Sequence, residues 1–195
     1  MYEAGGKRLM DLAGAALLLV LLAPLLLGVA LAVRLALGRP VLFRQVRAGR
    51  DGRPFTLLKF RSMAEGPGED AARLSRFGRK LRASALDELP QLLNVLRGEM
   101  SLVGPRPLPP DYTPLFSPGQ AARLRVRPGL AGLAQAAGRN ALPWGPRLAL
   151  DAAYAARPSF LGDLRLILRC ALLALRGQGA TAPGHATMPA FRGED

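Results

Sequence analysis

With 195 residues, the chain can form one modest domain plus an appendage. Its formal net charge of +13 indicates an anionic partner, such as a phospholipid surface, a nucleotide or a nucleic acid. The single cysteine, Cys170, excludes an internal disulfide, and the sequence contains no Cys/His cluster of the kind that binds zinc.

An apolar run without charged side chains occupies residues 12–33 and would be roughly 33 Å long as a helix, enough to cross a bilayer. Pro24 lies near its middle, where proline removes a backbone hydrogen bond and kinks a helix. Basic residues flank both ends of the run: Lys7, Arg8, Arg34 and Arg39. Because positive charge marks the cytoplasmic side, these residues fit a spanning helix and equally a re-entrant helix whose two ends lie in the cytoplasm.

Short apolar segments with turns follow the N-terminal run. Residues 41–43 and 55–58 are predicted to be the two strands of a β-hairpin, joined by the glycine-containing turn 48–53. Lys59 and Arg61 come directly after the second strand. They are either an ordinary solvated strand edge or contacts to phosphate.

A loop and a basic helix are predicted next. Residues 64–72 consist mainly of Gly, Pro, Glu and Asp and are expected to form a mobile loop. Residues 74–82 form a short basic helical pattern that ends at Arg82. Its basic face either meets phosphate or lipid headgroups or is simply solvated.

Two adjacent carboxylates, Asp87 and Glu88, precede an apolar helical pattern that ends in the Gly-Pro-Arg-Pro turn 104–107. Pro90 is tolerated only in the first turn of a helix, so the helix is predicted to begin close to Asp87. Its buried stripe is expected to consist of Leu92, Leu93 and Leu96. Ser84 and Asp87 have the spacing of a capping box, so helix capping is the ordinary explanation of this acidic pair.

Three further helices are predicted in the C-terminal half. Ser117 and Pro118 give an N-cap and a first-turn proline for a helix to about Val126, and a second helix covers residues 148–156. A third helix, residues 160–175, has apolar positions at helical spacing, typical of a helix on a membrane interface or on a core. The polar, Gly- and Pro-containing tail after it is expected to be disordered.

Three stretches resemble the bacterial sugar transferase family, the monotopic polyprenyl-phosphate phosphoglycosyl transferases. The first is LDELPQ at residues 86–91, continuing to MSLVGPRP at residues 100–107. The second is the hairpin region 40–63, and the third is RPGLAGLAQ at residues 127–135 with GRN at residues 138–140. The resemblance covers about residues 7–176. Ala23 precedes Pro24 where the family has serine.

The resemblance implies an α+β fold: a small helical domain with a short β-hairpin, anchored by an N-terminal re-entrant membrane helix bent at Pro24 and by interfacial amphipathic helices. The expected division is a membrane-inserted segment over residues 1–39, a catalytic domain over residues 40–176 and a disordered tail over residues 177–195. The implied location is the cytoplasmic face of the bacterial inner (plasma) membrane.

The implied reaction transfers a sugar-1-phosphate from a nucleoside-diphosphate sugar, with a UDP-sugar as the expected donor, to undecaprenyl phosphate, as the first membrane step of glycan assembly. Asp87 would attack the phosphate next to the sugar, giving a covalent phospho-sugar aspartate. Mg²⁺ would bridge Asp87 and the diphosphate, and Glu88 would act as base for the acceptor or as a second-shell partner of the metal.

The remaining candidates bind phosphate or substrate. They are Lys59, Arg61, Arg82, Arg106, Arg127, Gln135, Arg139, Asp151 and Tyr154. The expected partners are the UDP-sugar, undecaprenyl phosphate and inner-membrane phospholipids, without nucleic acid, and the expectation leaves room for a homodimer. The alternatives are a membrane-anchored scaffold without catalysis and a basic module that binds anionic lipid or nucleic acid; the few, scattered aromatic residues disfavour nucleic acid.

Overall fold

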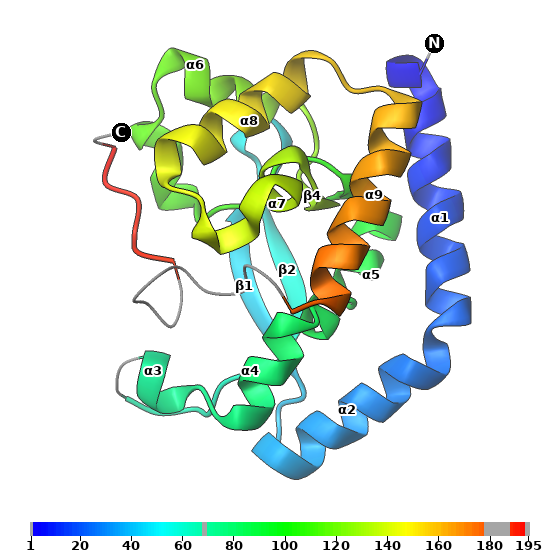
Figure 1. The fold of residues 1–195 in the computed structure, drawn as a ribbon, viewed down its shortest axis with the longest axis vertical. Helices are drawn as coiled ribbons and strands as arrows, with labels where there is room; N and C mark the ends of the chain where they lie inside the picture. The colour runs from blue at the N-terminus through cyan, green and yellow to red at the C-terminus, as the bar shows by residue number, and fades with distance from the viewer. Residues whose placement is uncertain (1, 68–69, 178–187, 194–195) are drawn as a thin grey trace.

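The computed structural model describes residues 2–67, 70–177 and 188–193. The fold is mixed but mostly helical: helices surround a two-stranded hairpin and a second, smaller two-stranded sheet (Figure 1). The sequence-based α+β assignment is confirmed at this level. The two sheets place the loops that carry the acidic pair and the Gly-Pro-Arg-Pro turn.

Two apolar helices form the N-terminal part, α1 (Lys7–Leu21) and α2 (Ala23–Leu37). The chain bends by 65° between them. Pro24 lies in the first turn of α2, where its missing N–H removes no hydrogen bond. The expected kink is therefore a break between two helices. Among the described residues no helix alone is long and apolar enough to cross a membrane, whereas α1 and α2 pass that test as a bent pair.

Helix α1 is fixed to the rest of the fold by buried polar contacts. The Asp11 carboxylate is 1% exposed and accepts hydrogen bonds from Ser101 Oγ at 2.9 Å and from the backbone N–H of Leu102 at 3.0 Å. The Lys7 ammonium lies 2.7 Å from the fully buried Asp163 carboxylate. A buried carboxylate is stable only with such partners, so these contacts set the position of α1.

The antiparallel hairpin consists of β1 (Leu42–Ala48) and β2 (Pro54–Phe60), with Leu42 opposite Phe60 and Ala48 opposite Pro54. A 3-10 turn (Arg50–Gly52) joins the strands. The predicted hairpin is confirmed, but both strands are longer than the apolar segments 41–43 and 55–58. The pairing continues through polar residues, Arg44, Gln45 and Arg47 in β1 and Thr56 in β2, which interrupt the apolar pattern.

The parallel sheet of β3 (Ser101–Val103) and β4 (Gly129–Ala131) was not predicted. Strands of three residues carry too short a pattern to be recognised. Gly129 permits their close approach, because a Cβ at this position would lie 2.1 Å from the backbone nitrogen of Gly104. The Gly-Pro-Arg-Pro turn begins directly at the end of this sheet.

The other helices surround the sheets. They are α3 (Asp70–Arg73), α4 (Arg76–Ala83), α5 (Gln91–Arg97), α6 (Pro118–Ala121), α7 (Leu133–Gly138), α8 (Trp144–Ala156) and α9 (Phe160–Leu175). Short 3-10 turns cover Leu86–Glu88, Pro110–Leu115, Ala122–Arg125 and Arg139–Ala141. Ser117 forms the predicted cap of α6, which continues as a 3-10 turn, and α9 has its predicted bounds.

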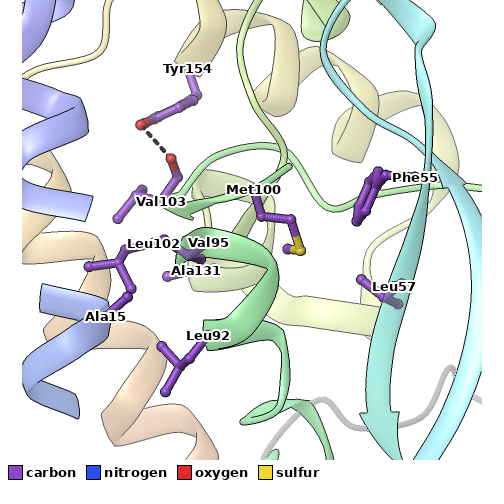
Figure 2. Packing of buried hydrophobic residues seen from close by; sticks show 10 residues of the cluster. All are labelled: Ala15, Phe55, Leu57, Leu92, Val95, Met100, Leu102, Val103, Ala131 and Tyr154. Atoms are coloured by element: carbon purple, nitrogen blue, oxygen red, sulfur yellow. Dashed lines mark hydrogen bonds between the residues drawn. The ribbon is translucent and has the colours of Figure 1, made fainter. Parts of the chain in front are cut away.

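The main core lies where α1, α5, β2 and β3 meet (Figure 2). Leu92 and Val95 of α5 pack there with Leu57 of β2 and Met100, and Ala15 brings α1 into the same cluster. Ten buried residues form the cluster drawn in Figure 2: Ala15, Phe55, Leu57, Leu92, Val95, Met100, Leu102, Val103, Ala131 and Tyr154.

Apolar side chains remain exposed along α1, α2 and α9. Leu168 of α9 is 65% exposed and Leu35 of α2 is 78% exposed, whereas Ile167 and Cys170 of α9 pack on the core. Helix α9 thus covers the core with one face and presents apolar side chains on the other. The alternative that α9 packs on the core is therefore confirmed, and the alternative that it lies on a membrane interface stays a prediction.

Two expectations near the acidic pair are corrected. The hydroxyl of Ser84 bonds back to the carbonyl oxygens of Lys80 and Leu81 at the end of α4, so it caps no following helix. Leu92 is buried and Leu96 packs on the core as predicted, but Leu93 is 38% exposed and Val95 is buried in its place.

The predicted disordered tail is also corrected in part. Residues 178–187 and 194–195 lie outside the described residues. Phe191, however, is 3% exposed and packs into an aromatic cluster with Tyr112, Phe116 and Trp144. A single aromatic residue in a polar tail was no sequence signal for docking, because its partners are distant in the chain.

Candidate active site

A cleft of about 1150 Å³ opens beside the hairpin and contains the acidic pair. Its wall is formed by the hairpin, the end of α4, the Gly-Pro-Arg-Pro turn, the segment before α8 and the C-terminal residues Met188 and Pro189. Nine basic and three acidic residues line it: Arg44, Arg47, Lys59, Arg61, Arg73, Arg82, Arg106, Arg139 and Arg147, with Glu65, Asp87 and Glu88. The excess of positive charge suits an anionic ligand.

The acidic pair sits on a tight turn between α4 and α5. Ala85 adopts a left-handed backbone conformation (φ 55°), which ends α4 and starts the 3-10 turn Leu86–Glu88. A non-glycine residue in this region is strained, and such strain is common at functional sites. The turn brings both carboxylates to the cleft.

Glu88 is held by two cations that come from distant parts of the chain. Lys59 Nζ at the end of β2 and Arg106 Nη2 each lie 2.7 Å from Glu88 Oε1. Burial acts to raise the pKa of Glu88, but Arg106 and Lys59 outweigh it and hold that pKa well below its ordinary value. Glu88 therefore remains ionised.

Asp87 has a different environment. Asp87 is 5% exposed, and its carboxylate has no hydrogen bond or ion pair among the described residues. Burial, with the neighbouring Glu88 charge, raises the pKa of Asp87 to about 6, against the opposing effect of Lys59. At neutral pH this carboxylate is ionised, poorly solvated and available to react.

Arg106 is positioned by a second layer of buried charge. Its backbone carbonyl oxygen accepts a hydrogen bond from Arg123, whose guanidinium also binds the Asp151 carboxylate at 2.8 Å. Asp151 is fully buried and lies behind the cleft. The predicted substrate residue Asp151 thus acts on Arg106 through Arg123.

Arg82 and Arg139 also line the cleft. Arg82 Nε donates to Ser62 Oγ at 2.9 Å, and Arg139 donates to the backbone carbonyls of Ala83 and Arg82. Arg139 has a left-handed backbone (φ 53°) where α7 ends. The two arginines, 57 positions apart in sequence, lie together at the end of α4.

Four cleft arginines were not predicted from the sequence: Arg44, Arg47, Arg73 and Arg147. Burial lowers the pKa of both Arg47 and Arg147 to about 10, and Arg147 stacks over Trp144 at 5.1 Å. A signal did exist for Arg147, because it lies one helical turn before Asp151. For Arg47 the hairpin register was needed, and the predicted first strand ended before it.

Gln135 points to a small cavity of about 20 Å³ next to Arg106, Arg139 and Arg147. Its amide oxygen and nitrogen are buried without a partner in the described structure. The space is sufficient for one water molecule. Gln135 therefore lies behind the arginines and does not line the main cleft.

Three predicted binding residues are used by the fold itself. Arg127 donates to the carbonyl oxygen of Gly98 and lies outside the cleft. The Tyr154 hydroxyl is 3.0 Å from the carbonyl oxygen of Val103, in the core shown in Figure 2, and 2.9 Å from Asp163. Arg61 lines the cleft, yet its guanidinium binds the carbonyl oxygens of Leu37 and Arg39 after α2.

The donor set for a metal is small. The described residues contain no cluster of three or more His, Cys, Asp or Glu side chains. Glu88 is occupied by its two cations, which leaves the Asp87 oxygens as the available carboxylate ligand beside it. Magnesium commonly binds one or two carboxylates together with substrate phosphates and water, so the arrangement fits such an ion once a diphosphate is present.

The chain was compared with known proteins. The model of the family "Bacterial sugar transferase" matches residues 2–177. The sugar transferase EpsL of Bacillus subtilis, described as uncharacterized, is 44% identical over 193 residues, which cover 96% of either chain. A UDP-glucose:undecaprenyl-phosphate glucose-1-phosphate transferase of Caulobacter vibrioides is 48% identical over 181 residues, 84% of this chain and 67% of the relative. The Escherichia coli protein of that name is 43% identical over 141 residues, 30% of its length.

Proposed function

Because the chain belongs to the bacterial sugar transferase family, we propose that it transfers a sugar-1-phosphate from a UDP-sugar to undecaprenyl phosphate, as the first membrane step of glycan assembly. The names of the relatives from Caulobacter vibrioides and Escherichia coli support the donor and acceptor classes. The observation that carries the proposal is Asp87: a buried carboxylate in a strongly basic cleft, with no hydrogen-bond partner in the described part of the chain.

In the first half-reaction, an Asp87 oxygen attacks the phosphorus next to the sugar. The bond from that phosphorus to the bridging oxygen breaks, and UMP leaves with the electron pair. An ionised carboxylate is required, and Asp87 is ionised above a pKa of about 6. The product is an acyl phosphate that joins Asp87 to the sugar phosphate.

In the second half-reaction, a phosphate oxygen of undecaprenyl phosphate attacks the same phosphorus. The Asp87–phosphorus bond breaks, the carboxylate is restored, and the product is undecaprenyl-diphospho-sugar. Both steps pass through one cleft, so a single set of cations can bind the phosphates of donor and acceptor.

Glu88 and the arginines have separate roles in this proposal. Glu88 fixes Lys59 and Arg106 beside the reacting phosphorus, and its low pKa makes it a poor proton acceptor. Arg82 and Arg139 bind phosphate oxygens from the opposite wall, since planar guanidinium groups match them. A Mg²⁺ ion on Asp87 would neutralise part of the charge of the diphosphate.

The location follows from the exposed apolar helices. We propose that α1 and α2 enter one leaflet from the cytoplasmic side and that the exposed face of α9 lies against the membrane. The acceptor phosphate, at the headgroup level, is then within reach of the cleft.

The test is a mass measurement with Asp87→Asn. The parent protein, incubated with a panel of UDP-sugars and Mg²⁺ but no lipid, should gain the mass of one sugar phosphate and release UMP. Asp87→Asn should do neither while retaining the parent circular dichroism spectrum. An active Asp87→Asn variant would refute the nucleophile and favour a binding role for the acidic turn.

A further inference from the structure

We propose that the C-terminal segment 188–193 forms part of the donor site and contacts the nucleoside half of the donor. This inference rests on the proposed function, because it assigns one end of the same cleft. Ten residues, 178–187, separate this segment from Gly177 in the sequence, and sequence alone does not connect it with catalysis.

The segment is anchored by Phe191. Its ring centroid lies 5.4 Å from that of Trp144 and 5.7 Å from that of Tyr112. The indole N–H of Trp144 donates to the carbonyl oxygen of Pro189 at 3.1 Å. Side-chain packing and a backbone hydrogen bond therefore hold the segment in one position, which a loose tail would lack.

This anchoring places Met188 and Pro189 in the wall of the cleft, beside Tyr112 and Trp144. The charged part of the cleft contains Lys59, Arg106 and the acidic pair. Its lining next to the segment, here called the apolar end, consists of Leu108, Pro109, Tyr112, Trp144, Met188 and Pro189. Apolar residues 41–43 of the hairpin line a separate part of the cleft. Arg147, stacked on Trp144, lies between the charged part and the apolar end.

A nucleoside-diphosphate sugar has the same division. Its sugar-linked phosphorus must reach Asp87, its diphosphate needs the arginines, and its nucleoside offers an aromatic base and a ribose to the apolar end. Binding sites for such ligands are usually apolar with a few positioned polar groups. The order of groups along the cleft matches the order of groups along the donor.

The lipid acceptor is a poorer occupant of this end. In Figure 1 the segment, drawn in red, lies near α6, on the opposite side of the molecule from α1 and α9. Those helices, with α2, carry the exposed apolar side chains that suit a membrane. A water-soluble donor can therefore reach the apolar end of the cleft from the side away from the lipid.

Trp144 provides a direct probe, because it is the only tryptophan of the chain and contacts both the segment and the cleft. Its emission reports docking of the segment without any turnover. If the segment contacts the nucleoside, binding is also reciprocal: UDP must stabilise the docked segment by as much as the segment strengthens UDP binding.

The experiment compares the full-length parent with Phe191→Ala in detergent, using UDP as the probe. Phe191→Ala should shift Trp144 emission to longer wavelength and weaken UDP binding about tenfold, as should a chain that stops after Thr187. The KM for the UDP-sugar should rise similarly, while the KM for undecaprenyl phosphate stays within about twofold of the parent value. A chain that stops after Gly193 is the matched control and should bind UDP as the parent does.

Hydrogen exchange of the parent gives a second measurement that needs no variant. Saturating UDP should slow exchange in residues 188–193, and undecaprenyl phosphate should not. Unchanged exchange, or parent-like UDP affinity in Phe191→Ala despite a shifted emission, would overturn the inference and leave the proposed function intact. A parent that binds UDP but forms no aspartate adduct would instead contradict the proposed mechanism and leave this inference standing.

Discussion

Asp87 and Glu88 follow one another in the chain, yet only Glu88 is held by cations. Lys59 and Arg106 each lie 2.7 Å from its Oε1 atom, whereas none of the described residues donates a hydrogen bond to Asp87. The two pKa values are therefore shifted in opposite directions: that of Asp87 is raised and that of Glu88 is lowered. Two identical functional groups thereby acquire different chemistry from their surroundings.

The raised pKa of Asp87 has a cost in stability. The folded protein holds this proton more tightly than the unfolded chain, so the contribution of Asp87 to stability is fully present below the ordinary aspartate pKa and is lost as the pH rises through about 6. Asp87→Asn cannot ionise. Between roughly pH 4.5 and pH 8, its free energy of unfolding should rise relative to the parent by about 2 kcal/mol. Thermal unfolding of the parent and of Asp87→Asn at the two pH values measures this change. The same difference between the two proteins at both pH values would contradict the prediction.

Glu88→Gln should destabilise the fold by about 2–3 kcal/mol, because it leaves Lys59 and Arg106 buried without a counter-charge. Since the pKa of Glu88 is lowered, the difference from the parent should narrow as the pH falls below the ordinary glutamate value. The double variant Glu88→Gln with Lys59→Met should recover part of the lost free energy of unfolding, as measured by denaturant unfolding. Glu65→Gln, which removes an exposed carboxylate paired with Arg61, is the control with a smaller effect. Equal losses of unfolding free energy in Glu88→Gln and Glu65→Gln would exclude the buried contacts of Glu88 as the cause.

Arg106→Lys keeps the charge but removes the planar fork that meets Glu88 with two N–H groups. We expect UMP release to slow by about tenfold or more in single-turnover measurements. Arg125→Lys, at an exposed arginine outside the cleft, should behave as the parent does. Parent-like turnover of Arg106→Lys would show that only charge is needed at this position.

The break at Pro24 predicts that both ends of the α1–α2 pair lie on the cytoplasmic side. In a Cys170→Ala background, Gly5→Cys and Arg39→Cys should both resist an impermeant thiol reagent in intact cells and react after permeabilisation. Gly5 has open space for a side chain and Arg39 is exposed, so neither change disturbs packing. Reaction of one cysteine alone in intact cells would indicate a spanning helix. Pro24→Ala should favour that outcome, because alanine restores the missing N–H.

Local patterns predicted much of the fold. Helix α9 has its predicted bounds because Ser159 supplies a cap whose hydroxyl accepts from the N–H of Gly162, a signal within four residues. The hairpin followed from its glycine turn. The β3–β4 pair did not, because three-residue strands depend on a partner almost thirty positions away. The docked Phe191 depends on partners that are still more distant in the sequence.

The candidate site was predicted as far as its residues lie in the short sequence stretches that resemble the family. Asp87, Glu88, Lys59, Arg82, Arg106 and Arg139 were all named from the sequence, and the structure brings them to one cleft. Arg127 and Tyr154 were named with them, but their side chains bind backbone oxygens elsewhere. A motif identifies which residues matter and cannot separate those that meet a ligand from those that hold the fold.

The buried contacts of α1 have a consequence for how this protein can be divided. Removing residues 2–37 would expose the core at Ala15, take the Asp11 carboxylate from Ser101 and Leu102, and take the Lys7 ammonium from the buried Asp163. A water-soluble catalytic fragment is therefore not available by trimming the apolar helices. For the same reason recombination could not replace the helix pair with an unrelated pair of apolar helices, and the pair must be inherited together with the rest of the fold.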